Sequence, residues 1–314
     1  MPTSVTSAGL KAGADKVILS ARPYLEFLAD FSINFKPLTA ARYDSIAVEV
    51  LNASEEAFGP GAGYTHGTNS IRPAAVPLTE HRKSTWNIGD RDALENELAP
   101  CWSWFGPKAG LAVAARAVTF AMSKLTYSAA TSQITQATYS ALADFTTIMA
   151  KVVDLGLDPG ICVLLLNPTA FASLLSVLPA YVKGDDGDAL RYARIGEFLG
   201  FKSVRLAPHA SKVSGAAVEG VTPQNGFGFI VPEGALAVAD RIVTPVRKGG
   251  NLIEFGTFTD DVTGFAFGTR VVLDTDQGTC SWTTEALYGV ALAKQTLPDN
   301  TSNNAPGFYQ LITA

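Results

Sequence analysis

The stretch from residue 254 to 297, EFGTFTDDVTGFAFGTRVVLDTDQGTCSWTTEALYGVALAKQTL, decides the fold. In its central run every second side chain is aromatic, aliphatic or threonine, and these side chains share one face: Phe265, Phe267, Thr269, Val271 and Leu273. The intervening side chains at 266, 268, 270 and 272 take the other face, and this period of two predicts a half-buried strand. A turn sequence at 274–278 separates it from two further strand-like runs, 279–283 and 287–292. We therefore expect the chain to end in long antiparallel strands, with Phe265, Phe267 and Tyr288 in the core.

The composition indicates a subunit of a larger assembly. Of 314 residues, 47% are hydrophobic and only 17% are charged. Soluble domains are nearer ~25% charged, and charge is depleted where subunits meet. A net charge of −5 argues against a basic face that grips nucleic acid, although it is compatible with enclosing it. The three separated cysteines predict reduced thiols, and no apolar run is long enough to span a membrane.

The first 90 residues have little capacity to build a core of their own. Residues 1–45 predict an arm with a short amphipathic helix after Pro23. Residues 46–90 predict a long hairpin, in which a strand near 45–51 leads to a glycine-rich tip at 59–67 and a return run at 71–88. Prolines in the return run favour an isolated ribbon over a central strand. Such an excursion is suited to reaching across a neighbouring subunit.

Helices are predicted next. Asp90 is a plausible cap for a helix at 91–98, which Pro100 and Pro107 are expected to interrupt. The alanine-rich residues 108–125 predict a strong helix, and residues 135–155 predict a second one.

A lobe of short strands and helices follows. The apolar run at 160–168, GICVLLLNP, predicts a buried strand stopped by Asn-Pro. A short helix over 169–178 follows, with Thr169 as its expected cap. Strand and turn signals continue to residue 246, so residues 159–246 predict a compact α/β lobe.

No catalytic or ligand-binding constellation is found. His66, His81 and His209 lie in separate segments without the spacing of metal ligands. The glycines at 59–67 follow a strand but precede no helix, so they do not predict a phosphate loop. The acidic residues at 185–188, 260–261, 274 and 276 are interpreted as turn formers, and the aromatic cluster at 102–105 as core or interface packing. The sequence thus predicts no catalytic, cofactor-binding or metal-binding residue, no cofactor and no enzyme.

Several of these segments together carry a resemblance to a known family. They are VLLLNPTAFASL (163–174), IGEFLGFKSV (195–204), FIVPEGALA (229–237), TGFAFGTR (263–270) and EALYGVAL (285–292). In their order and spacing across residues 45–297 they resemble the major capsid proteins of tailed bacteriophages, whose Hong Kong 97-like fold encapsulins share.

The resemblance implies an α+β fold with named parts. Residues 1–45 would be an N-terminal arm and 46–90 an extended loop. Residues 91–158, containing a spine helix, would join residues 247–314 in a peripheral domain with long strands. Residues 159–246 would be an axial domain at the symmetry centres.

The function that the resemblance implies is mechanical. Pentamers and hexamers of the chain would form the icosahedral head of a tailed phage and enclose double-stranded DNA without sequence-specific binding. Scaffolding, portal and decoration proteins are further implied partners. The implied location is the virion capsid, assembled in the host bacterial cytoplasm and without a membrane.

Two departures from the family pattern lead to expectations of their own. The arm has no long coiled-coil pattern, so we expect a separate scaffold or none. Residues 260–265 contain no Asn, so a Lys–Asn cross-link is not expected and Lys83 is interpreted as an ordinary basic residue.

Three alternatives remain at this stage. The first is an encapsulin-like nanocompartment shell enclosing a cargo enzyme. An enzyme such as a hydrolase would need an acid/base pair that the sequence does not show. A tail or tube protein is disfavoured by the two predicted helices.

Overall fold

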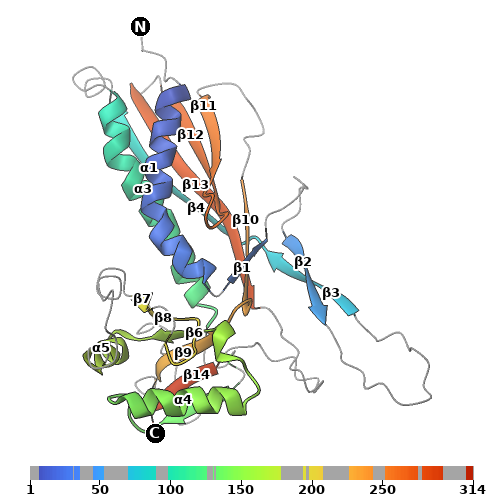
Figure 1. Ribbon diagram of the computed structural model, residues 1–314. Coiled ribbons are helices and arrows are strands. Elements are labelled where there is room, and N and C mark those ends of the chain that lie inside the picture. The colour runs from blue at the N-terminus through green and yellow to red at the C-terminus, as the bar shows by residue number, and fades with distance from the viewer. Residues whose placement is uncertain are drawn as a thin grey trace.

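The computed structural model describes residues 7–30, 32–35, 45–52, 70–89, 98–125, 130, 132–177, 194–195, 198–207, 226–242, 252–274, 278–292 and 309–313. Two six-stranded sheets form the body, and a separate two-stranded ribbon projects from it. Figure 1 shows two long helices lying along the upper sheet and the lower sheet packed beneath them. The predicted α+β class is confirmed.

The upper sheet is organised around one strand, β13 (Thr279–Leu292). β12 (Ala266–Asp274) pairs with its first half and β10 (Leu236–Arg241) with its second half. β4 (Glu80–Gly89) pairs with residues 279–288. Leu287 and Tyr288 pair with both β4 and β10, so these two strands lie on opposite sides of β13. β11 (Leu252–Thr259) extends the sheet beyond β12, and β1 (Ser32–Phe35) extends it beyond β10.

The predicted terminal meander is therefore confirmed, with two corrections. The runs at 279–283 and 287–292 form one continuous strand, and residues 284–286 between them are buried on both faces of the sheet. The apolar run at 235–239 is part of β10 and pairs with β13 in the upper sheet. The sequence had placed this run within the 159–246 lobe.

Helices α1 (Ser7–Ala29) and α3 (Leu98–Met122) cover one face of the upper sheet (Figure 1). Gly110 permits their close approach, because a Cβ there would lie 2.5 Å from the carbonyl oxygen of Val17. The sheet's aromatic face meets the helices, as the contact between the Phe120 and Tyr288 rings shows, with centroids 6.1 Å apart. Phe265, Phe267 and Tyr288 are all buried, which confirms their predicted place in the core.

Prolines interrupt these helices less than the sequence predicted. α1 begins 16 residues before Pro23 and runs through it, and α3 runs through both Pro100 and Pro107. Pro100 lies in the first turn, where the backbone N–H has no helical partner to lose. Pro23 is exposed, while Val17, Ala21 and Leu25 around it are buried against the core. Burial of this face offsets the ~3 kcal/mol cost of an interior proline. The expected helix at 91–98 lies outside the described residues, apart from Leu98.

The lower sheet has the order β5-β14-β9-β6-β8-β7. Its strands are β5 (Ser132–Gln136), β6 (Cys162–Leu166), β7 (Arg194–Ile195), β8 (Ser203–Leu206), β9 (Gly226–Pro232) and β14 (Tyr309–Thr313). The C-terminal strand β14 lies inside the sheet, parallel to β5 and antiparallel to β9. The predicted buried strand ending in Asn-Pro is confirmed as β6, which is buried along its whole length.

Both faces of β6 are covered. Val163 and Leu165 belong to the core shared with α1, α3 and the upper sheet, whereas Leu164 and Leu166 pack with the helices below. Those helices are α4 (Leu142–Asp154) and α5 (Pro168–Val177). A short 3-10 turn, η2 (Pro159–Ile161), directly precedes β6. The two sheets are thus joined by a continuous apolar core.

Two predicted helix starts were wrong. Residues 135–136 belong to β5, and α4 begins only at Leu142. Asp144 explains this boundary, because its carboxylate accepts hydrogen bonds from the backbone N–H groups of Ser140 and Ala141. At α5 the cap is Asn167, whose Oδ1 accepts from the Ala170 N–H at 2.8 Å, and Pro168 takes the first helical position instead of Thr169.

The ribbon consists of β2 (Ser45–Asn52) and β3 (Ser70–Pro77), paired only with each other among the described strands. The predicted isolated ribbon is confirmed, but it ends at Pro77. The rest of the return run, from Glu80, is β4 of the upper sheet.

Candidate functional site

The described part of the chain contains little that could support chemistry. It holds no group of three or more His, Cys, Asp or Glu side chains placed to bind a metal ion. Nor does a helix in this part have the length and apolar character needed to cross a membrane. His66, His209, the acidic residues at 185–188 and the glycine-rich tip lie outside the described residues, as do the side chains of Trp102 and Trp104.

The one described histidine, His81, belongs to a charged cluster on the sheet face opposite the helices. Glu285 is 3% exposed there, and its Oε1 accepts a hydrogen bond from Arg270 Nε at 2.5 Å. Its Oε2 lies 3.1 Å from His81 Nε2. Lys83 is the cross-strand neighbour of Glu285 and is exposed. The cluster fixes β4, β13 and β12 to one another, and it offers no nucleophile for the carboxylate to activate.

A second buried carboxylate, Asp260, stabilises the turn between β11 and β12. Its Oδ2 accepts from Thr263 Oγ1 at 2.6 Å and from the Thr263 N–H at 3.1 Å. Its Oδ1 accepts from Arg22 of α1, with Nη2 at 2.9 Å. Burial alone would raise the pKa of Asp260, but the hydrogen bonds from Thr263 and Arg22 outweigh it and hold the pKa below its ordinary value. The predicted turn former therefore also anchors a helix.

A third ionic contact joins the two sheets. Asp30, just after α1, pairs with Arg205 of β8, and Arg205 is 7% exposed. Beside it, Lys202 Nζ donates to the Asp30 carbonyl at 3.2 Å and pairs with Glu233 at 2.9 Å. Glu233 lies in the turn that carries the chain from β9 to β10, so these contacts fix the end of α1 at the junction of the sheets.

Sequence reasoning missed these ion pairs. Arg22 and Asp260 are 238 positions apart, and a local pattern cannot connect them. For the pair Asp30–Arg205 the sequence did contain a signal. Arg205 is the one charge in the run at 203–207, and a charge in a buried strand needs a partner.

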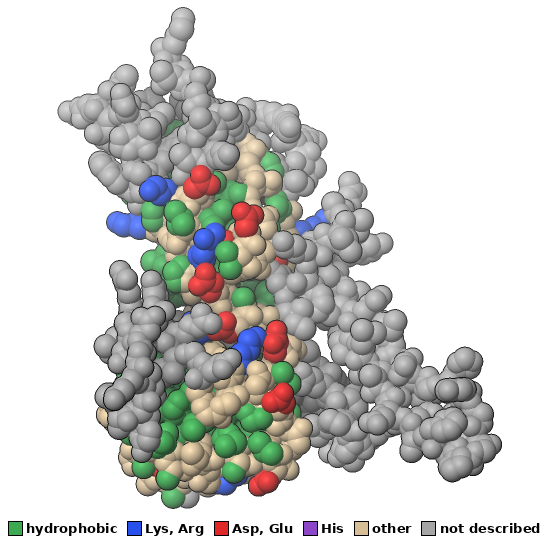
Figure 2. Space-filling view, in the orientation of Figure 1, with side chains coloured by type: hydrophobic (Ala, Val, Ile, Leu, Met, Phe, Trp, Pro, Cys, Tyr) green, Lys and Arg blue, Asp and Glu red, His purple; other side chains and the backbone are tan. Residues whose placement is uncertain are grey.

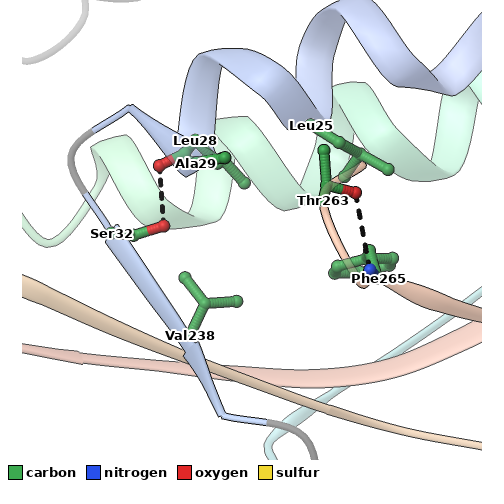
Figure 3. A pocket seen from close by; sticks show the side chains of 7 residues that line it. All are labelled: Leu25, Leu28, Ala29, Ser32, Val238, Thr263 and Phe265. Carbon is green, nitrogen blue, oxygen red and sulfur yellow. Dashed lines mark hydrogen bonds between the residues drawn. The ribbon is translucent and has the colours of Figure 1, made fainter. Parts of the chain in front are cut away.

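One small pocket opens beside α1 (Figure 3). Its volume is about 160 Å³, below the roughly 300–1,000 Å³ of typical ligand sites. The two hydroxyls on its wall are engaged with backbone, since Ser32 Oγ donates to the Leu28 carbonyl and Thr263 Oγ1 accepts from the Phe265 N–H. The other lining residues are Leu25, Ala29 and Val238. We interpret the pocket as a packing defect of the apolar core.

The buried thiol of Cys162 is not a reactive centre. Cys162 is fully buried, and its Sγ donates to the Asp158 carbonyl oxygen at 3.3 Å. Burial, reinforced by the charge of Asp158, raises the pKa of Cys162 to about 12. The thiolate needed for nucleophilic chemistry is therefore absent at neutral pH.

The most distinctive surface feature is the ribbon and its attachment. Where β3 ends, the backbone of Pro77 and Leu78 crosses directly over Gly289 of β13. Val76 and Leu78 are buried there against Ala237 and Ala239 of β10. The base of the ribbon is thus fixed to the sheet, while its strands pair with no other described strand. A two-stranded hairpin is at best marginally stable alone.

Comparison with known proteins identifies the fold. No protein-family model matches the chain, and no curated protein matches its sequence. A solved structure titled Mycobacterium phage Adephagia matches with a TM-score of 0.51 at 13% identity, over 93% of this chain and 90% of that chain. Mycobacterium phage Cain matches with a TM-score of 0.50 at 14% identity, over the same shares. A capsid structure of the cyanophage P-SCSP1u gives a TM-score of 0.48 at 15% identity, over 92% and 88%.

The first two matches extend over nearly the whole of both chains, so the similarity concerns the complete architecture. At this level of identity they show a shared fold. The predicted Hong Kong 97-like fold is thereby confirmed.

Proposed function

We propose that the chain is the major capsid protein of a tailed double-stranded DNA bacteriophage. The observation that carries this proposal is the fold, shared over nearly the full length with chains of two phage structures. Fold alone does not imply function, so the proposal also depends on the surface. A ribbon whose strands pair only with each other among the described strands and the low charge of the sequence both favour a structural subunit.

The parts of the fold suggest roles in a shell. The ribbon, β2 and β3, would lie over a neighbouring subunit as the extended loop. The upper sheet with α1 and α3 would form the peripheral domain, and the lower sheet with α4 and α5 the axial domain. We propose to count β5, β14 and α4 with the axial part, because β5 and β14 pair in the lower sheet and α4 packs on it, and β10 with the peripheral part, because it pairs with β13.

The N-terminal arm takes a different form in this proposal. Most of it is helix α1, which packs on α3 of the same chain instead of lying free. Contacts from this segment to a neighbour would then come from its exposed side or from residues that flank it.

The experiment is expression of the chain alone and together with the scaffolding protein of its phage. Size-exclusion chromatography and electron microscopy should show capsomers or closed particles of uniform size. A chain that stays monomeric or dimeric under every condition would refute the proposal.

The encapsulin-like alternative shares the fold and predicts the same particles. Their contents separate the two functions. Nuclease-protected double-stranded DNA inside particles from infected cells supports the phage head, and a packaged enzyme in place of DNA supports the nanocompartment.

A further inference from the structure

Exposed apolar side chains gather in two places on the molecule. Seven large hydrophobic residues with described side chains are 38% to 61% exposed. Single exposed apolar residues are normal, but a group of them marks an interaction surface. Two of the seven, Leu19 and Leu111, lie on the packed helices α1 and α3, and three others, Val153, Leu155 and Ile161, lie within nine residues at the end of α4 and in η2. Phe105, also on α3, stacks on Trp86 of β4 and belongs to neither group. Figure 2 shows hydrophobic surface over both the upper and the lower part of the described molecule.

The upper group, hereafter the helix patch, is basic. Leu19 and Leu111 lie within two residues of Val17 and Gly110, where α1 and α3 approach so closely that a Cβ at Gly110 would meet the Val17 carbonyl oxygen at 2.5 Å. Exposed cations accompany them, Lys108 and Arg116 on α3 and Lys16 on α1. The sequence of α3 contains no Asp or Glu, and α1 contributes one exposed acid, Asp15.

The lower group, hereafter the turn patch, is acidic. Asp154 and Asp158 are both exposed among its three apolar side chains. Two nearby cations are half-buried and engaged elsewhere. Lys151 donates to the Thr135 carbonyl and to Gln136 Oε1, and Lys202, whose backbone N–H donates to the Pro159 carbonyl, pairs with Glu233. The two patches therefore combine similar apolar character with opposite charge.

We propose that the helix patch of one copy of the chain binds the turn patch of a second copy. Each patch would repel its own counterpart on another molecule, so the contact joins two different surfaces. A contact of this kind repeats from copy to copy and closes into a ring when the rotation allows. This proposal rests on the proposed function, in which subunits form pentamers and hexamers, and it names two surfaces that meet within them.

The test is a charge-swap cycle measured as the critical concentration for assembly by light scattering. Lys108→Glu and Asp154→Lys are the two single variants, and both sites are exposed. Asp154 closes α4, where a lysine is favoured by the helix dipole, so Asp154→Lys should fold. Each single variant is expected to raise the critical concentration roughly tenfold, because it places like charges together. The double variant should return to within about threefold of the parent, because it restores opposite charges.

The controls separate this contact from general surface charge and from folding. Thr257→Glu, on β11, adds a charge at an exposed position on the sheet face opposite the helices and should leave the critical concentration unchanged within about twofold. Melting temperature and circular dichroism check that each variant folds. A variant that does not fold is replaced by its neutral form, Lys108→Gln or Asp154→Asn, with the same direction expected.

Single variants that assemble like the parent overturn the proposal, as does a double variant no better than the singles. In both cases the parent still assembles, and the proposed function stands. A parent chain that never assembles refutes the proposed function itself.

Discussion

Gly289 is the position where a single methyl group should disturb the ribbon. In Gly289→Ala the new Cβ would lie 2.0 Å from the Pro77 carbonyl oxygen, 2.8 Å from the Pro77 carbonyl carbon and 3.2 Å from Leu78 Cα. Ordinary contacts between such atoms are about 3.5 Å, so the base of the ribbon must move by more than about 1 Å. All three atoms are backbone, and no side-chain rotation can relieve the overlap.

The expected cost follows from overpacking. Inserting a methyl group where backbone must shift costs about 1–3 kcal/mol of unfolding free energy. At roughly 2–4 °C per kcal/mol for a chain of this size, the melting temperature should fall by about 2–12 °C. Displacing the crossing also loosens Val76 and Leu78, which are buried beneath it. Limited proteolysis should then cut near residues 76–79 faster than in the parent, and particle yield should fall.

Gly268 provides a matched control on the neighbouring strand. A Cβ at Gly268 would meet only side-chain atoms, the nearest being Glu285 Cγ at 3.4 Å. Gly268→Ala should therefore change the unfolding free energy by less than about 0.5 kcal/mol. Equal melting temperatures for Gly289→Ala and Gly268→Ala, with equal proteolysis, would refute the argument that the ribbon is fixed by a glycine.

Three further predictions concern the core, the buried carboxylate and the thiol. Phe267→Asp places a charge at a fully buried position and should abolish soluble subunits in an expression trial; a folded, soluble subunit that merely fails to assemble would contradict the placement of Phe267 in the core. Asp260→Asn should lower the unfolding free energy at pH 7 by about 2 kcal/mol. The difference in melting temperature between parent and variant should narrow below about pH 4. The pKa of Asp260 is depressed in the folded state, so its stabilisation is lost as the pH falls through that folded-state pKa. A gap that stays constant down to pH 2 would argue against an ionised Asp260. Cys162 should resist alkylation at pH 8 in the native protein and react in denaturant, as followed by mass spectrometry; rapid native labelling would show that β6 opens.

The sequence predicted the strands of the body well where periodicity was strong. The alternation at 265–273 and the apolar run before Asn167 each mark one strand, because burial on one face or both leaves a local pattern. It failed where distant residues decide the outcome. Pro23 and Pro107 look like helix breakers locally, yet the surrounding face of each helix is buried by partners elsewhere in the chain.

Sheet membership was equally invisible to local patterns. The residues at 235–241 do not themselves indicate whether this strand pairs with β9, its neighbour in sequence, or with β13, its partner in the structure. The expectation that the chain has no catalytic residue stays a prediction. The ion pairs that hold α1 in place needed coordinates to be seen, since their members are 175 and 238 positions apart.

The central place of β13 has a consequence for the timing of synthesis. Glu80 of β4 pairs with Tyr288, 208 positions later (288 minus 80), and Ser132 of β5 pairs with Tyr309, 177 positions later (309 minus 132). At about 5–20 residues per second, β4 waits roughly 10–40 s on the ribosome for its partner strand. The upper sheet becomes complete only with β13 and the lower sheet only with β14. A chain truncated before residue 309 therefore cannot display a finished subunit surface.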